Sequence, residues 1–212
     1  MPVVTISAQY GAGGSVIAPA VAEALGLPFV DRAIPVQVAG ELGVSVDESL
    51  AHDGLAENGW ASRWLSGAAW LAGGGLVAPA GDTSGATLSD QAFVDHTESV
   101  LRGLATGAGA VILGRAAAVV LAEQPGALHV RLHGPPDHRV RQAVALRGVD
   151  DTTATRERAD SDRARAAYVK RFYRRDPDDP CLYHLICDST AISIDAVTSM
   201  ITVAARARSG QG

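Results

Sequence analysis

Cysteine is nearly missing from this sequence. Only Cys181 and Cys187 are present, so the fold does not rest on a disulfide framework, and no His/Cys spacing has the pattern of a zinc site. The chain also enters a strand-like segment with no basic region before it, so we expect no signal peptide. Together these features predict a reduced, cytoplasmic setting.

Long apolar runs are missing as well. The two most apolar stretches are 65–80, which three glycines interrupt, and 108–122, which Arg115 interrupts. Neither reaches the roughly 20 apolar residues that a bilayer-spanning helix needs. We therefore expect no membrane partner.

Positive charge is not in excess. A formal net charge of −5 argues against nucleic acid as a partner, because a phosphate backbone is bound by a basic surface. Arginines nevertheless concentrate in one third of the chain, where they fit either a local anion site or a solvated helix face with interleaved acidic residues. They are Arg131, Arg139, Arg141, Arg147, Arg156, Arg158, Arg163, Arg165, Arg171, Arg174 and Arg175.

What the sequence does contain is a glycine-rich turn near its start. A β-branched run at 3–7 is followed by the turn Ala8-Gln9-Tyr10-Gly11-Ala12-Gly13-Gly14-Ser15, and then by apolar residues at helical spacing over 16–25. Strand, glycine loop and helix form the geometry of a phosphate cradle, because glycines let backbone N–H groups approach an anion at a helix N-terminus. The lysine that usually completes such a cradle is absent.

Strand-like and helix-like segments alternate along the rest of the chain. With 47% hydrophobic and 19% charged residues, this pattern predicts a single α/β domain over 1–212, with about five parallel strands flanked by helices. We expect a helical insert at 33–90 and a lid-like helix at 152–175. The expected strands are 3–7, 29–31, 110–113, 128–132 and 183–187, and the later expected helices are 87–106, 116–123, 138–147, 152–173 and 194–206.

Several polar segments follow strands directly, and they should meet at one rim of the sheet. These are the loop 7–15, the pair Asp31-Arg32 and the pair Gly114-Arg115. Open α/β sheets bind ligands at the carboxyl ends of their strands, and arginine pairs bidentately with phosphate oxygens. The rim therefore predicts a site for a nucleotide or another phosphorylated small molecule, although Asp31 could equally cap the helix that follows it.

Tryptophans gather in the segment 52–90, which is otherwise rich in glycine and small residues. Trp60 and Trp64 are four positions apart and would share one face of a helix. Three interpretations remain open: a helical cover over a substrate, a homodimer contact through Trp60–Trp70, or part of the core.

Four segments together resemble the cytidylate kinase-like family of P-loop kinases in order and spacing. They are VVTISAQYGAGGSVIAPAVAEALGLPFVDRAI, AVILGRAAAVVL, VRLHGPPDHRVRQAVALRG and SDRARAAYVKRFY with the later DPCLYHLICDS. In the last, Asp162, Arg165 and Tyr168 match the family's lid pattern at intervals of three. The resemblance covers most of the chain.

This resemblance implies roles for individual residues. Gly11, Gly13, Gly14 and Ser15 would form the phosphate loop, with Ser15 placed to bind Mg²⁺. Asp31 and Arg32 would lie near an acceptor monophosphate, Arg115 would reach a phosphate, and Asp162 with Arg165 would belong to the lid. The implied reaction transfers the γ-phosphoryl group of ATP to a nucleoside monophosphate, with CMP as the named substrate, and ATP and Mg²⁺ are the implied cofactors.

The loop departs from the Walker A pattern G-x-x-x-x-G-K-[ST] at two positions. Ala8 stands at the first glycine and Gly14 at the lysine, so the loop carries no cation. Catalysis would then depend on Arg115, Asp162 and Arg165, since a cation acting in the transition state is worth orders of magnitude in rate. Two hypotheses follow: a nucleoside-monophosphate kinase that uses arginines outside the loop, and a catalytically weak or inactive module that binds a nucleotide or other anion as a sensor. A kinase of another small molecule would use the same site.

Overall fold

The computed structural model describes residues 2–30, 98–99, 101–114 and 116–210. Within this part, five parallel strands form one sheet with the order β2-β3-β1-β4-β5. The strands are β1 (Val3–Ala8), β2 (Phe29–Val30), β3 (Ala110–Leu113), β4 (Leu128–His133) and β5 (Leu185–Asp188). The predicted α/β fold with about five parallel strands is confirmed.

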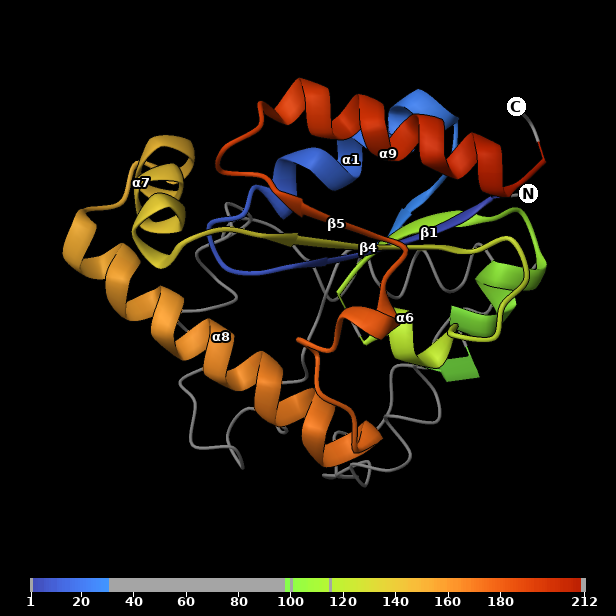
Figure 1. Cartoon of the computed structure of the whole chain (residues 1–212), viewed down its shortest axis with the longest axis horizontal. Helices are drawn as coiled ribbons and strands as arrows, with labels where there is room; N and C mark the ends of the chain where they lie inside the picture. Colours follow the sequence, from blue (N-terminus) through green and yellow to red (C-terminus); the bar gives the residue numbers. More distant parts are fainter. Residues whose placement is uncertain (1, 31–97, 100, 115, 211–212) are drawn as a thin grey trace, which may run out of the picture.

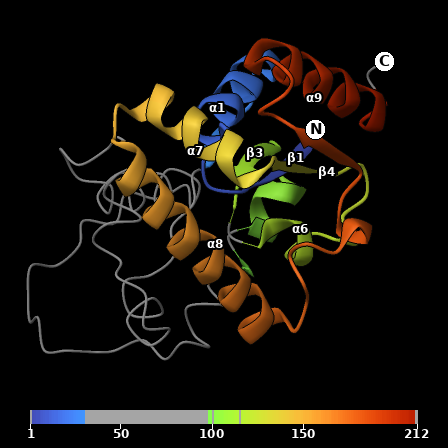
Figure 2. The same cartoon turned by 60° about the vertical axis from the view of Figure 1, so that its left-hand side comes forward.

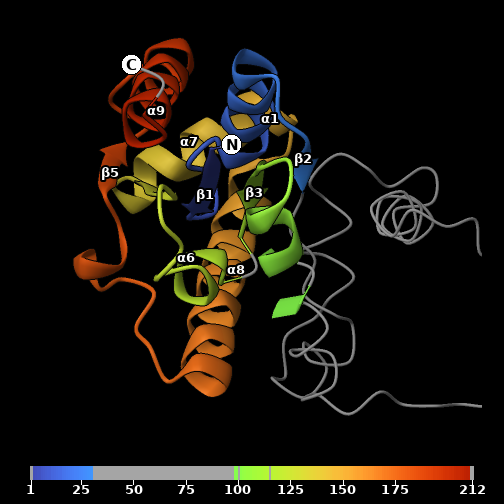
Figure 3. The same cartoon turned by 90° about the vertical axis from the view of Figure 1, so that its right-hand side faces the viewer.

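Helices lie on both sides of this sheet and complete three layers. In Figures 1 and 3, α1 and α9 cover one face, and α6 and α8 lie on the opposite side. Figure 2 shows that α7 and α8 form a hairpin at the end of the sheet where β4 leads out. The helices include α1 (Gly14–Leu25), α6 (Ala117–Val120), α7 (Pro136–Arg147), α8 (Asp151–Tyr173) and α9 (Ile194–Arg208), with a 3₁₀ turn, η1, at Pro180–Leu182. Residues 98–99 and 101–106 are helical as well.

Local signals in the sequence set most helix boundaries. The Asp150 carboxylate caps α8 by accepting the N–H of Thr153 at 2.9 Å, and Ser193 caps α9 in the same way. One predicted helix is shorter than expected: of the range 116–123, only Ala117–Val120 form a helix, α6. The reason is that the chain must turn within a few residues to enter β4 at Leu128.

The two faces of the central strands differ in chemistry. Val4, Ile6 and Val130 pack against the buried residues of α1 and α9 in the largest apolar cluster. Because side chains alternate along a strand, their neighbours point to the opposite face. There, a second apolar cluster around Leu101 and Ile112 covers β3 and the start of β1. Further along, that face of β1 and β4 is polar, with Thr5, Ser7, His129 and Arg131.

Several expectations concern residues outside the described ranges. They are Asp31, Arg32, Arg115, most of the helix expected over 87–106, the insert 33–90 and the tryptophan segment Trp60–Trp70. Among the residues that are described, no helix combines the length and the apolar character needed to cross a membrane.

Candidate functional site: a glycine loop held by α7, α8 and β5

Glycine is required in the loop between β1 and α1 on steric grounds. Gly11 and Gly13 have φ values of 73° and 70°, in the left-handed region that other residues rarely adopt. A Cβ at Gly11 would lie 2.1 Å from the carbonyl oxygen of Arg139, and one at Gly13 would lie 2.8 Å from Nε2 of Gln142. The loop is therefore packed tightly against the start of α7.

The loop and the first turn of α1 present unused hydrogen-bond donors. No described residue accepts from the backbone N–H groups of Gly11, Gly13, Gly14 or Ser15. Helix α1 begins without a side-chain cap and without an acidic residue in its first turn. Adjacent N–H groups at a helix N-terminus attract anions, so these residues fit the phosphate groups of a nucleotide. Ser15, in the first turn of α1, is exposed.

The two departures from the Walker A pattern are linked by geometry. A Cβ added at Gly14 would lie 2.4 Å from the Cβ of Ala8, which is closer than two carbon atoms can approach. With alanine at position 8, position 14 must therefore be glycine. The two departures therefore have one steric cause: only one of positions 8 and 14 can carry a side chain.

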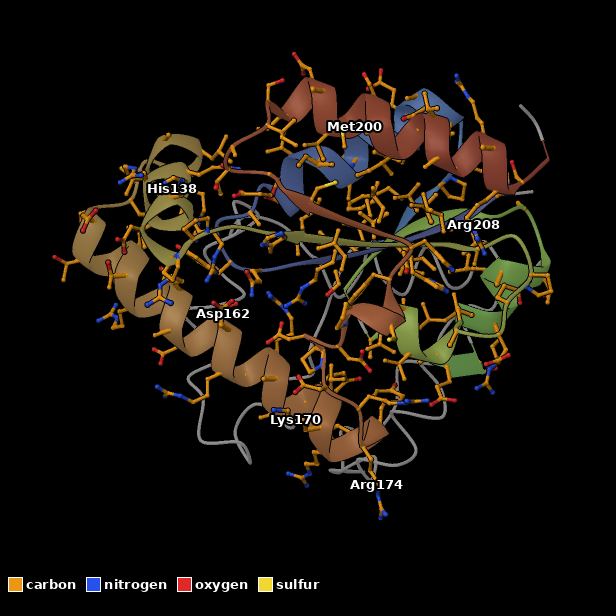
Figure 4. All side chains as sticks on the ribbon, in the orientation of Figure 1. His138, Asp162, Lys170, Arg174, Met200 and Arg208 are labelled. Carbon is orange, nitrogen blue, oxygen red and sulfur yellow. The ribbon has the colours of Figure 1, made fainter. Side chains whose placement is uncertain are left out.

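Two charged side chains hold the Tyr10 peptide from both of its ends. The Asp162 carboxylate accepts the Tyr10 N–H at 3.2 Å, and Arg139 donates from Nη1 to the Tyr10 carbonyl oxygen at 2.9 Å. Arg139 and Asp162 also form an ion pair of 2.8 Å, while Arg139 Nε donates to the Gly134 carbonyl. Figure 4 shows Asp162 at the middle of α8. Together these contacts fix the backbone between the strand and the glycines.

The Tyr10 side chain makes a second connection to the helices. Its hydroxyl donates to Glu157 Oε2 at 2.6 Å, and Arg147 Nη1 donates both to that hydroxyl and to Glu157. The ring packs with Val140 and Ala154 in a small apolar cluster between α7 and α8. Burial, and next the hydrogen bond to Glu157, raise the Tyr10 pKa well above its ordinary value. The phenol is therefore neutral and acts as a donor.

The far side of the loop is fastened to the end of β5. The Ser189 side chain is buried, and its hydroxyl donates to the Ala12 carbonyl oxygen at 2.8 Å. The backbone N–H of Ser189 donates to His133 at the end of β4. Asp188 accepts hydrogen bonds from the backbone and hydroxyl of Thr190, which lower its pKa. The carboxyl ends of β1, β4 and β5 thus meet at the loop.

The residues predicted from sequence fall into two groups. Gly11, Gly13, Gly14 and Ser15 lie where β1 passes into α1, and Asp162 contacts the backbone of this loop; that the four residues bind phosphate stays a prediction. Arg165 forms an ion pair with Asp162, with 3.7 Å between Nη1 and Oδ1, and so belongs to the same cluster. Asp31, Arg32 and Arg115 lie outside the described residues, so their convergence on the loop stays a prediction.

Sequence reasoning missed several residues that hold the loop. Tyr10, Arg147, Glu157 and Ser189 have ordinary patterns in the sequence, because their role comes from partners more than a hundred positions away. The high density of arginine after β4 was the only signal, and it did not indicate which arginines were structural. Within the described part of the chain, no group of three His, Cys, Asp or Glu side chains could hold a metal ion.

The parallel sheet, its strand order and the glycine loop before α1 define a protein with the fold of the P-loop kinases. The chain belongs to the cytidylate kinase-like family, because the model of that family matches residues 3–191. Among curated proteins, none matches the sequence significantly.

Several solved structures resemble this chain at low sequence identity. A crystal structure of an uncharacterized protein from Eubacterium ventriosum ATCC 27560 has 18% identity and a TM-score of 0.67, over 98% of this chain and 100% of that chain. A gluconokinase from Sinorhizobium meliloti 1021 has 14% identity and a TM-score of 0.49, over 99% and 94% of the two chains. A shikimate kinase from Acinetobacter baumannii has 13% identity and a TM-score of 0.44, over 95% and 90%. At 18% identity, the likeness to the Eubacterium ventriosum structure extends to the fold alone.

Proposed function

We propose that this protein is a phosphotransferase that moves the γ-phosphoryl group of ATP to a nucleoside monophosphate, with CMP as the first acceptor to test. One observation carries the proposal: in a cytidylate kinase-like chain, the N–H groups of Gly11, Gly13, Gly14 and Ser15 lie at the N-terminus of α1 and have no acceptor among the described residues. Such a group of donors stabilises phosphate oxygens without any side-chain cation.

The residues of the chain divide the work in this proposal. When bound, ATP supplies the phosphoryl group and Mg²⁺ neutralises part of its charge. The loop orients the phosphates, and Arg139, Asp162 and Ser189 hold the loop's backbone in the orientation that binds them. The cation that the loop lacks comes from arginines outside it, for which Arg115 and Arg165 are the candidates.

CMP as acceptor rests on family membership alone. Asp31, Arg32 and Arg115 would contact its monophosphate, as the resemblance of their segments to the family implies. The tryptophan segment Trp60–Trp70 would then act as a cover over the acceptor or as a homodimer contact.

A second candidate function is binding without turnover. The observation in its favour is Gly14, which stands where a kinase loop carries its phosphate-binding lysine, in a packing that excludes any side chain there. A protein of this kind would bind a nucleotide or another phosphorylated small molecule and report its presence to a partner.

A panel of nucleoside monophosphates separates the two functions. The purified protein is incubated with ATP, Mg²⁺ and each monophosphate, and ADP release is followed in a coupled assay, while calorimetry measures ATP binding. The kinase proposal expects turnover with at least one acceptor, and CMP above the others. ATP binding with no turnover across the panel would instead support the binding module. No binding of ATP at all would contradict the kinase proposal.

A further inference from the structure

The face of the sheet that points away from α1 and α9 carries a buried arginine, Arg131. Ser7 in β1 and Arg131 in β4 are register partners, and Arg131 Nη1 donates to the Ser7 hydroxyl at 2.9 Å. Parallel sheets are ordinarily apolar on both faces, because helices cover them. A guanidinium on this face is therefore a costly choice, unless it has a partner of opposite charge.

Arg131 is almost completely buried, with 6% of its side chain exposed. A buried guanidinium requires anionic or hydrogen-bonding partners, since an unpaired charge in such a place is strongly destabilising. Within the described part of the chain, its hydrogen-bond partners are Ser7 and the Asp178 carboxylate. The ring of Tyr183 lies beside it, 5.7 Å from ring centre to guanidinium carbon.

Asp178 is an unusual counter-ion for a buried charge. Its side chain is 65% exposed, and it lies in the turn between α8 and η1. Because the Asp178 carboxylate is already largely solvated, exchanging it for another anion costs little, provided that Arg131 keeps an anionic partner. Arg131 cannot follow it, since it extends from the interior of the sheet. The pair is therefore asymmetric, with a fixed cation and a displaceable anion.

The position of this pair relates it to the loop. Ser7 directly precedes Ala8, the position at which the Walker A pattern begins, and the loop that follows carries no cation. Arg131 is thus a desolvated cation anchored immediately behind a lysine-free phosphate loop. Its neighbours Val130 and Leu132 face α1 and α9, so Arg131 lies on the opposite face of the sheet, the side on which Figure 1 shows α8.

We propose that Arg131 binds an oxyanion of the phosphorylated ligand, and that Asp178 occupies this position until the ligand displaces it. The ligand class is a phosphate group, from either the donor nucleotide or a phosphorylated acceptor. This inference rests on the proposed function, which supplies the phosphorylated ligand. It adds Arg131 to Arg115 and Arg165 as a source of the charge that the loop lacks.

Two variants test the inference by calorimetry with pyrophosphate, ATP and CMP as separate probes. Asp178→Asn removes the competing carboxylate and should tighten binding about two- to fivefold, in keeping with a partly exposed pair. Arg131→Gln removes the cation and should weaken binding by at least about tenfold. Asp160→Asn is the matched control: Asp160 pairs with Arg163 on the exposed side of α8, and affinity should not change.

The probes identify the source of the phosphate. An effect confined to ATP and pyrophosphate assigns Arg131 to the donor, and an effect confined to CMP assigns it to the acceptor. If Arg131→Gln does not fold, Asp178→Asn decides alone, because its side chain is exposed. Unchanged or weaker binding by Asp178→Asn overturns the inference. Failure of the unsubstituted protein to bind any of the probes overturns the proposed function instead.

Discussion

At the scale of single residues, the pair Ala8 and Gly14 defines what this phosphate loop can be. The added Cβ at position 14 and the Cβ of Ala8 compete for one space. In the Walker A pattern the same competition is resolved the other way, with glycine first and lysine seventh. In this chain the methyl group of Ala8 fills the space beside Leu113 and α1. This packing leaves no room for a lysine at position 14.

This linkage predicts a non-additive pair of substitutions. Gly14→Lys alone should destabilise the protein by about 1–3 kcal/mol, because overpacking forces the backbone to shift. Ala8→Gly/Gly14→Lys should recover most of that loss and bind ATP more tightly than the unsubstituted protein, since the lysine can then reach the phosphates. Urea denaturation and calorimetry measure the two effects. Ala8→Gly alone is the control, and equal stabilities for Gly14→Lys and the double variant would contradict the linkage.

At the scale of elements, α8 is a support for the loop. The sequence resemblance predicted a lid containing Asp162 and Arg165. In the structure, Asp162 accepts a hydrogen bond from the backbone N–H of Tyr10, and Glu157 accepts one from the Tyr10 hydroxyl. Helix α8 is thus joined to the loop at two points along its first half. If α8 moves, either the loop moves with it or these two contacts break. The position of α8 and the conformation of the loop are therefore coupled.

Removal of one hydroxyl should reveal this coupling. Tyr10→Phe keeps the ring between α7 and α8 but removes the donor to Glu157, whose side chain is 2% exposed. We expect a loss of about 1–3 kcal/mol in the free energy of unfolding, the range for a buried charged acceptor that loses a partner. ATP affinity should fall with it, because the loop is less well held. Tyr173→Phe, at the far end of α8, should leave ATP affinity unchanged, and an equal fall there would contradict a specific role for Tyr10.

At the scale of the whole molecule, the polar face of the central sheet makes stability depend on pH. His129 is buried on β4, with Nδ1 2.8 Å from the Thr5 hydroxyl and its ring stacked on His184 at 4.9 Å. Burial, and next the neighbouring His184, lower the His129 pKa to about 4 from an ordinary 6.5. Burial also lowers the pKa of His184. Both rings are therefore neutral in the folded protein at neutral pH.

The sign of the pH dependence follows from these shifts. Between pH 6.5 and 4 the unfolded chain binds a proton that folded His129 does not, so stability is complete above pH 6.5 and falls as the pH approaches 4. The loss for His129 amounts to at most about 3 kcal/mol. Urea denaturation at a series of pH values measures it, and His129→Gln should flatten the curve in this interval. An unchanged slope in that variant would assign the dependence to other groups. His184 adds to this dependence with the same sign, because burial lowers its pKa as well.

The sequence by itself determined the strands, most helices and the glycine loop, because these depend on neighbours a few positions apart. Alternation of strand and helix, β-branched runs and a glycine-rich turn are local properties, and they were enough to predict an α/β fold with a glycine loop before the first helix. The resemblance of whole segments then indicated the family.

Only the tertiary structure decided which side chains serve the loop. The strand order places β4 beside β1 and β5 beside β4, and this brings Arg139, Asp162 and Ser189 to the loop from 129, 152 and 177 positions away. Arg131 likewise became a candidate ligand-binding residue only in the tertiary structure. There the sheet register places it beside Ser7, and its ion-pair partner Asp178 is exposed. Contacts of this kind depend on how the whole chain is folded, and arginines with the same local pattern differ in role because they have different distant partners.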